Sequence, residues 1–397
     1  MKMDKTQIYC DCALSSFRTF ILIKIAIVVI KSLKVLYACL GICFFVSLAF
    51  SEDETQKKAQ LALVVDFSKS GETAIQAITT NYWDLYNSFR EEHPNVKLEL
   101  ALIGYSKQSF GSHNHYVKVI SKFKDSPEKA FEFLVSNKDG SSVSENNVGH
   151  ALNSALNALD WDSDESVKKQ IITIGNGPIK DNYSLAQKVC AKAKKKHIVV
   201  NSLYVLYREK DKNHSYWLAL TEMSGGRLKT IVPQYLIGGD TDYRTNQNDK
   251  KIINENEYLN STYLGYGEMA ETGLTRLNEL DEKSSEIGYK TLSSRIQFKG
   301  SPYFQGINTD WDLVEKFHFE NFTDFDKIIL PRELKGLNND QIEVALQMQW
   351  EERKTSLQII HMLIQANKQI NADFPEKPAY KRDIVETILN LFSEGGF

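Results

Sequence analysis

The chain has 397 residues, and 42% of them are hydrophobic, which is enough for a sizeable core and excludes a disordered protein. Its formal net charge is −3. Residues 1–51 hold six of the 48 Lys and Arg residues and two of the 51 Asp and Glu residues, so the remainder carries −7. Because the chain beyond residue 51 is mildly acidic, its charge gives no sign of nucleic-acid binding, and no nucleic-acid partner is expected.

Residues 1–51 are unlike the rest and are predicted to form an N-terminal extension with a signal peptide. Residues 35–50 form a run of sixteen without a charge, which is short for a membrane span but fits a signal-peptide core. Lys31 and Lys34 supply a basic flank, and small residues precede a predicted cleavage after Ser51. We therefore expect an exported protein that is periplasmic, at the cell surface or secreted. The alternative is an uncleaved anchor, which would be its only contact with a membrane.

Cysteine and motif content argues against several kinds of site. Four of the five cysteines precede the predicted cleavage, so Cys190 is alone in the mature chain and no disulfide is expected there. The sequence has no GxSxG elbow, HExxH motif, Walker A loop or GxGxxG motif. His113 and His115 form a His-x-His pair. Without further ligands nearby in sequence, solvated loop histidines are favoured over a transition-metal site.

The hydrophobic pattern predicts strands that alternate with helices over residues 58–236. An apolar run at 61–65 predicts a strand buried on both faces. The short connection between predicted strands 96–105 and 116–123 favours an antiparallel edge strand. Further strands are predicted at 170–175, 198–207 and 227–232, and helices at 71–91, 126–135, 148–159, 183–196 and 216–223. This order predicts an α/β domain in three layers, with a doubly wound, mostly parallel sheet.

The remainder of the chain differs from this domain in composition. Residues 237–258 are polar and rich in Asn, Asp and Lys, so they are predicted to form a linker. Residues 259–397 are predicted to be an α-rich C-terminal extension, mainly because 339–372 carries a long helical pattern.

Oxygen-bearing side chains follow the first buried strand. Asp66, Ser68 and Ser70 place one carboxylate and two hydroxyls on one tight turn, at the strand end where open α/β sheets bind ligands. Oxygen ligands of this type suit a hard divalent cation such as Mg²⁺. The alternative is that the two serines cap the next helix and Asp66 merely ends the strand.

The pattern Asp66-x-Ser68-x-Ser70 after a buried strand resembles the metal-ion-dependent adhesion site of von Willebrand factor type A (vWA) domains. The predicted order of elements, with its antiparallel third strand, is similar to the vWA fold. The resemblance therefore implies that fold, and it implies that two further loops contribute to the site.

Those two loops supply the remaining candidates. In the loop before the third major helix, either Ser142 or Ser144 resembles the family's second contribution, although Ser144 is equally typical of a helix N-cap. Asn176 stands where the family has an aspartate, so one negative charge is lost and weaker cation affinity is implied. Segments 259–267 and 301–314 also resemble the tail of some exported bacterial A-domain proteins.

The resemblance implies an exported, non-enzymatic interaction or adhesion module that binds a protein partner through Mg²⁺, with Mn²⁺ or Ca²⁺ as alternatives. In the implied mechanism Ser68 and Ser70 bind the cation directly, Asp66 and Asn176 hold its waters, and an acidic residue of the partner completes the coordination. Two alternatives stay open. One is a Mg-dependent phosphohydrolase with Asp66 as nucleophile, although neither Asn176 nor Ser142 supplies the second carboxylate that it needs. The other is a vWA scaffold whose metal site is vestigial.

Overall fold

The computed structural model describes residues 57–141, 147–179, 182–208, 211–236, 247–372 and 384–394. The predicted extension 1–51 and the candidate ligands Ser142 and Ser144 lie outside these residues. None of the helices in the described ranges combines the length and apolar character that crossing a membrane requires.

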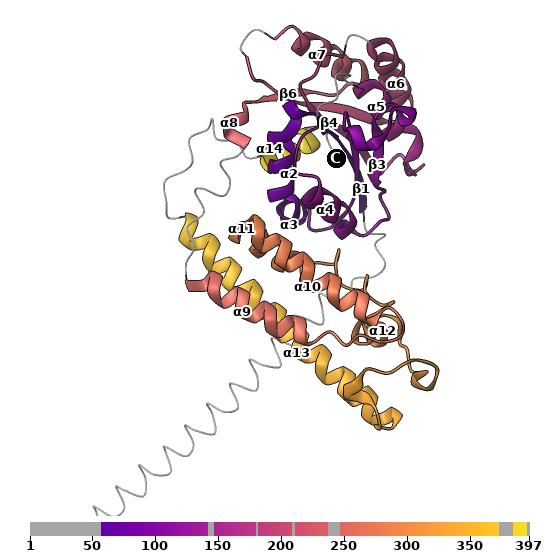
Figure 1. Ribbon diagram of the computed structural model, residues 1–397, viewed down its shortest axis with the longest axis vertical. Coiled ribbons are helices and arrows are strands. Elements are labelled where there is room, and N and C mark those ends of the chain that lie inside the picture. The colour runs from indigo at the N-terminus through magenta and orange to yellow at the C-terminus, as the bar shows by residue number, and fades with distance from the viewer. Residues whose placement is uncertain are drawn as a thin grey trace, which may run out of the picture. The chain divides into compact units, whose positions relative to one another are not determined.

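A six-stranded sheet is the centre of the described α/β domain (Figure 1). Its strands are β1 (Lys57–Asp66), β2 (Val96–Tyr105), β3 (Val117–Ser121), β4 (Lys168–Gly175), β5 (Ile198–Val205) and β6 (Leu228–Ile231). They lie in the order β3-β2-β1-β4-β5-β6, and all neighbours are parallel except β2 and β3. β1 is buried from Ala59 to Asp66, as a strand covered on both faces should be. The predicted doubly wound sheet and its antiparallel edge strand are confirmed.

Helices cover both faces of the sheet. One face carries α2 (Glu72–Thr80), α3 (Tyr82–Glu92) and α4 (Pro127–Ser136), and the other carries α5 (Val148–Ala158), α6 (Tyr183–Lys195) and α7 (Asn213–Ser224). Successive side chains of a strand point to opposite faces. Leu61 and Leu63 therefore join the core under α2 to α4, whereas Ala62 and Val64 join the core under α5 to α7.

The single helix predicted over 71–91 is two helices in the structure. The chain leaves helical geometry at Asn81, where φ is −107° and ψ is 15°. The side-chain amide of Asn81 donates a hydrogen bond of 2.8 Å to the carbonyl of Ala77. Asparagine side chains compete with the backbone for such hydrogen bonds, which explains why the helix is interrupted here.

The C-terminal region is helical, as predicted. It contains α8 (Pro233–Leu236), α9 (Gln247–Ser261), α10 (Ala270–Ile287), α11 (Tyr289–Lys299), α12 (Leu313–Glu320), α13 (Asn339–Ala372) and the 3-10 turns Phe325–Lys327 and Arg332–Leu334. α9 begins inside the segment 237–258 that the sequence predicted as a linker. Half of the residues that α9 buries are polar, since Asp249 and Asn256 lie beside Ile252 and Leu259. A polar buried face gives little hydrophobic periodicity, so the sequence pattern does not predict this helix.

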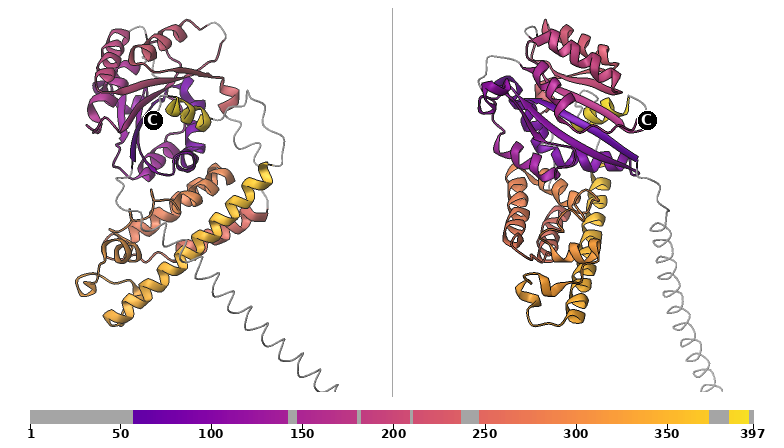
Figure 2. Two further views of the ribbon diagram at one scale, coloured as in Figure 1. Left: turned by 180° about the vertical axis from the view of Figure 1, so that it is seen from behind. Right: turned by 90° about the vertical axis from the view of Figure 1, so that its right-hand side faces the viewer.

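The last helix, α14 (Ile384–Ser393), returns to the sheet and packs beside α3 and β5 (Figure 2). The Phe392 ring meets Phe89 edge to face at 5.4 Å. Gln170 of β4 donates a hydrogen bond of 2.9 Å to the Phe392 carbonyl. In the chain, helices α9 to α13 therefore lie between β6 and α14, and α14 completes the cover of the sheet. The region from α9 to α13 is thus an insertion into the α/β domain as well as part of the C-terminal extension.

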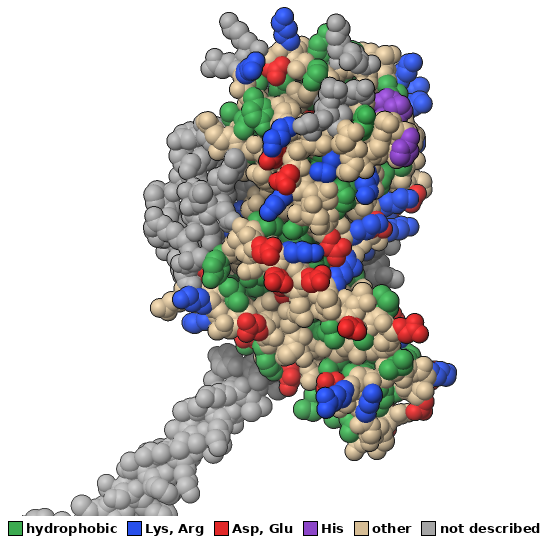
Figure 3. Space-filling model, in the orientation of Figure 1, with side chains coloured by type: hydrophobic (Ala, Val, Ile, Leu, Met, Phe, Trp, Pro, Cys, Tyr) green, Lys and Arg blue, Asp and Glu red, His purple; other side chains and the backbone are tan. Residues whose placement is uncertain are grey.

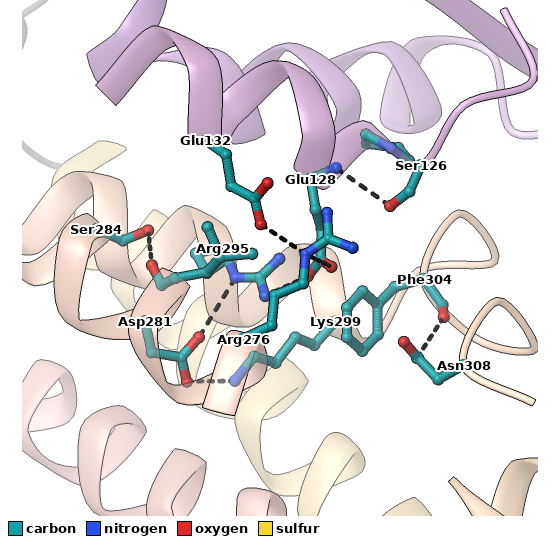
Figure 4. A network of polar contacts seen from close by, with 12 residues as sticks. Ser126, Glu128, Glu132, Arg276, Asp281, Ser284, Arg295, Lys299, Phe304 and Asn308 are labelled. Carbon is teal, nitrogen blue, oxygen red and sulfur yellow. Dashed lines mark hydrogen bonds and ion pairs between the residues drawn. The ribbon is translucent and has the colours of Figure 1, made fainter. Parts of the chain in front are cut away.

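Buried charges join the insertion to the α/β domain (Figure 4). Arg295 of α11 donates to Glu128 of α4 at 2.5 Å and to Asp281 of α10 at 3.3 Å. Lys299 also pairs with Asp281. Burial acts to raise the pKa of Asp281, but the charges of Lys299 and Arg295 outweigh it and lower that pKa to about 2. Elsewhere on the surface, acidic and basic side chains are interspersed on the face that Figure 3 shows.

Candidate functional site

Asp66 ends β1 and is fully buried. Its Oδ1 atom accepts a hydrogen bond of 2.9 Å from the backbone N–H of Ser68. Its Oδ2 atom is buried and has no hydrogen-bond partner among the described residues. Burial raises the pKa of Asp66 to about 6, although the hydrogen bonds from Ser68 act in the opposite direction. A carboxylate held in this way has one oxygen that no described residue satisfies.

The other described candidates converge beside Asp66. The hydroxyls of Ser68 and Ser70 are 3.1 Å apart, and the Ser70 hydroxyl donates to Oδ1 of Asn176 at 3.1 Å. Asn176 directly follows β4, the neighbour of β1 in the sheet. Parallel strands bring their carboxyl ends to the same edge, so residues separated by more than a hundred positions meet there. The two hydroxyls and the amide are accessible, whereas the carboxylate lies beneath them.

The third loop approaches this site as well. Ser141 forms a bridge with Ser68, in which Lys69 N–H donates to the Ser141 carbonyl at 2.8 Å and Ser141 N–H donates to the Phe67 carbonyl at 2.9 Å. A Cβ atom on Gly140 would lie 2.6 Å from the Ser68 carbonyl oxygen, so only glycine permits this approach. Ser142 and Ser144 follow immediately but lie outside the described residues, so their positions stay predictions.

Two tyrosines belong to the site and were not predicted. Tyr105 is the last residue of β2 and lies opposite Asp66 in the β1–β2 register. Its hydroxyl is buried and without a hydrogen-bond partner in the described part of the chain. Burial, followed by the nearby charge of Asp66, raises its pKa. Tyr207 donates a hydrogen bond of 2.7 Å to the Ser70 carbonyl and so holds the first loop. Only the strand register could have identified Tyr105, and that register is not visible in one sequence.

The residues present fit a hard divalent cation. They offer a carboxylate with an unsatisfied oxygen, two hydroxyls and an amide oxygen, and such oxygen ligands are those that Mg²⁺ and Ca²⁺ take. The described residues contain no group of three or more His, Cys, Asp or Glu side chains able to hold a metal ion. The described ranges thus contain neither a cluster of His or Cys ligands, which softer metals prefer, nor a site with several carboxylates.

The described domain has a vWA-type fold, with the strand order and the antiparallel β3 given above. No family model matches the chain, and neither does any curated protein. Among solved structures, the SpRpn10 VWA domain is similar at 13% identity and a TM-score of 0.32, over 44% of this chain and 88% of that one.

Two other solved structures are similar over part of the chain. The pilus adhesin SpaC of Lactobacillus rhamnosus GG, in its open conformation, has 14% identity and a TM-score of 0.34, over 46% of this chain and 29% of that one. The manganese-loaded TRAP protein of Plasmodium vivax has 15% identity and a TM-score of 0.27, over 42% of this chain and 63% of that one. This chain thus covers less than two thirds of either protein.

Proposed function

We propose that this vWA-type domain belongs to an exported protein-binding module that captures an acidic residue of a partner protein through a divalent cation. Mg²⁺ is the expected ion, with Mn²⁺ or Ca²⁺ as alternatives. The observation that carries the proposal is the convergence of Asp66, Ser68, Ser70 and Asn176 at one sheet edge, around a buried carboxylate oxygen with no partner in the described chain.

Each residue has a role that its position supports. The accessible hydroxyls of Ser68 and Ser70 would bind the cation directly, and Ser142 or Ser144 would add a third hydroxyl. Asp66 and Asn176 would hold its waters. A bound cation would supply the positive charge that attracts a carboxylate. Because Asn176 is neutral, a divalent ion beside Asp66 alone leaves a net positive site, which costs cation affinity but favours an acidic partner.

The competing function is a phosphohydrolase in which Asp66 is the nucleophile. A nucleophile must present an oxygen to its substrate, yet Asp66 is fully buried and one of its oxygens is bound by Ser68 N–H. The chemistry also needs a second carboxylate near the metal, and Asn176 occupies the nearest strand end. These two observations favour the binding function.

Cation binding is tested first, by thermal unfolding of the wild-type protein and of Asp66→Asn in EDTA and in millimolar MgCl₂ or MnCl₂. A ligand at a hundredfold excess over its Kd stabilises the folded state by about 2.7 kcal/mol, so the wild-type midpoint should rise and that of Asp66→Asn should not. Asp164→Asn is the matched control, because Asp164 is exposed on the loop before β4, at the opposite end of the strands. Identical wild-type midpoints in EDTA and in both metals would favour a vestigial site.

Partner capture separates the binding module from the enzyme. Immobilised wild-type protein should retain a partner from the cell envelope in Mg²⁺ and release it in EDTA, and Asp66→Asn should retain none. Hydrolysis of p-nitrophenyl phosphate by the wild-type protein, lost in Asp66→Asn, would overturn the proposal. Cell fractionation and sequencing of the mature N-terminus test export.

A further inference from the structure

A groove of about 750 Å³ lies between the loop that follows β2, the edge strand β3 and helix α5. The loop contains the 3-10 turns η2 (Gln108–Phe110) and η3 (Ser112–Asn114). None of the candidate cation ligands described above lines this groove, so it is separate from that site. Its volume falls in the range of small-molecule sites in proteins.

Three histidines line the groove, two of which the sequence had assigned to a solvated loop. His115 of the loop and His150 of α5 stack with their ring centroids 3.7 Å apart and their planes at 13°, and His113 lines the same groove. The stack joins the two walls. Burial, and next the neighbouring His115, lowers the pKa of His150.

The described polar lining is rich in hydrogen-bond donors. No Asp or Glu among the described residues lines the groove, although the body of the chain is acidic. Within the described residues, the ring nitrogens of the three histidines make no hydrogen bond, and neither does the side-chain nitrogen of Asn153, whose Oδ1 and carbonyl accept from Asn157. Lys118 also lines the groove, but its ammonium lies over the Phe133 ring, 5.0 Å from the centroid. His113 and His115 are exposed and His150 and Asn153 are partly buried, so these donors face solvent and are available to a ligand that accepts hydrogen bonds.

The loop also stores backbone strain. Ser106, His115 and Tyr116 have φ of 61°, 53° and 54°, and they are three of the five non-glycine residues with positive φ in the described ranges. A side chain other than glycine is strained in this left-handed conformation. Ser106 N–H donates to the Tyr116 carbonyl at 2.9 Å, which closes the loop on itself. Strain of this kind persists mainly where it serves a site.

We propose that this groove binds an anionic sugar, meaning a saccharide unit that bears a carboxylate, phosphate or sulfate group. The imidazole nitrogens would donate hydrogen bonds to the anionic group, because no described residue occupies them. The amide of Asn153 and the hydroxyls of Ser109 and Ser154, which also line the groove, would pair with sugar hydroxyls. An isolated phosphate ion would fill only a small part of about 750 Å³.

The experiment is a titration of the full mature protein in EDTA with glucose 6-phosphate, glucose 6-sulfate and glucuronate, followed by calorimetry and by NMR of the histidine ring protons. Glucose and inorganic phosphate are the reference ligands. At least one anionic sugar should bind ten times more tightly than either reference. Binding equal to that of glucose or of phosphate, or no binding, would overturn the proposal.

Variants place the ligand in the groove. Asn153→Asp adds a carboxylate of the same shape, and His115→Phe keeps a ring for the stack but removes both nitrogens. Each should weaken binding at least tenfold, whereas His197→Gln, at an exposed histidine paired with Glu165, should not. If either variant fails to fold, the histidine ring protons of the wild-type protein still test whether the ligand binds in the groove, because their NMR signals should shift on binding. Binding should persist in Asp66→Asn, and its loss there would assign the ligand to the cation site instead.

Discussion

Arg295 of α11 donates a hydrogen bond of 2.5 Å to the carboxylate of Glu128 on α4, and both side chains are buried (Figure 4). The guanidinium also lies over the Trp83 ring of α3, 4.7 Å from its centroid. One charged pair thus joins a helix of the insertion to the face of the sheet that carries α2, α3 and α4. Other hydrogen bonds, such as that from Asn87 to the Ser294 carbonyl at 2.9 Å, join α11 to α3 beside this pair.

We expect Glu128→Ala to lower the free energy of unfolding by about 3–5 kcal/mol, because it leaves the buried charge of Arg295 without its closest partner. Urea denaturation measures the loss. Glu132→Ala is the control on the same helix, since Glu132 pairs with the part-exposed Arg276 and should cost no more than about 1 kcal/mol. Equal losses in the two variants would show that the buried pair has no special role.

Phe392→Ala should lower the free energy of unfolding by about 3–5 kcal/mol, although only five residues follow it in the sequence. Its ring is fully buried against Phe89, and α14 completes the cover of the sheet. Glu394→Ala, which removes ion pairs to Arg227 and Lys229, should cost less than about 1 kcal/mol. Both losses are read from urea denaturation. A near-neutral Phe392→Ala would show that α14 is a dispensable tail.

The sequence was sufficient for the sheet and for the core of the site. β1 and β4 are apolar on both faces, which identifies central strands, and their carboxyl ends must share an edge. The resemblance to the vWA site groups Asp66, Ser70 and Asn176, and their contacts in the structure bring them to one edge of the sheet. The roles assigned to Ser142 and Ser144 stay predictions.

The features that the sequence does not predict depend on contacts between residues that are distant in sequence. Tyr105 reaches the site only because β2 pairs with β1 in a register that sets it opposite Asp66. The buried polar face of α9 is satisfied from other helices, for example by the hydrogen bond of 2.8 Å from Asn367 to Asp249. α14 is amphipathic, but nothing local indicates that it covers a sheet whose previous strand ended at Ile231.

The pH dependence of stability should report the burial of Asp66. Its pKa is about 6 in the folded chain and 3.8 in ordinary surroundings. A raised carboxyl pKa stabilises the folded state below about pH 4 and loses that contribution as the pH rises through 6. In EDTA, the free energy of unfolding of the wild-type protein should therefore fall by about 3 kcal/mol relative to Asp66→Asn between pH 4 and pH 7. Parallel urea profiles for the two proteins would contradict the assigned pKa.

Gly175→Ala should destabilise the protein and weaken cation binding. A Cβ at this position would lie 2.4 Å from the Tyr105 hydroxyl and 3.3 Å from the unpartnered Oδ2 of Asp66. We expect a loss of about 1–3 kcal/mol from overpacking. Tyr105→Phe removes the hydroxyl that the methyl group meets, so the double variant should regain part of the loss. Additive losses in denaturation, with no coupling, would show that the two groups do not meet.

Asn176→Asp should tighten the binding of Mg²⁺. The Asn176 side chain accepts a hydrogen bond from the Ser70 hydroxyl at 3.1 Å, so an aspartate in the same position would add a second carboxylate beside Asp66. More carboxylates raise affinity for a hard divalent cation, and one extra charge-assisted interaction corresponds to about a tenfold fall in Kd. Calorimetry of the wild-type and variant proteins measures this change.

The same substitution carries a cost that distinguishes the roles of the two residues. Without a cation, a second carboxylate beside Asp66 introduces repulsion, so Asn176→Asp should lower the thermal midpoint in EDTA and raise it in Mg²⁺. Because the added charge also neutralises the loaded site, capture of an acidic partner should weaken even as the cation binds more tightly. Asn157→Asp, at an exposed asparagine near the C-terminal end of α5, is the control and should leave Mg²⁺ affinity unchanged. Unchanged or weaker Mg²⁺ affinity in Asn176→Asp would show that this side chain does not take part in holding the ion.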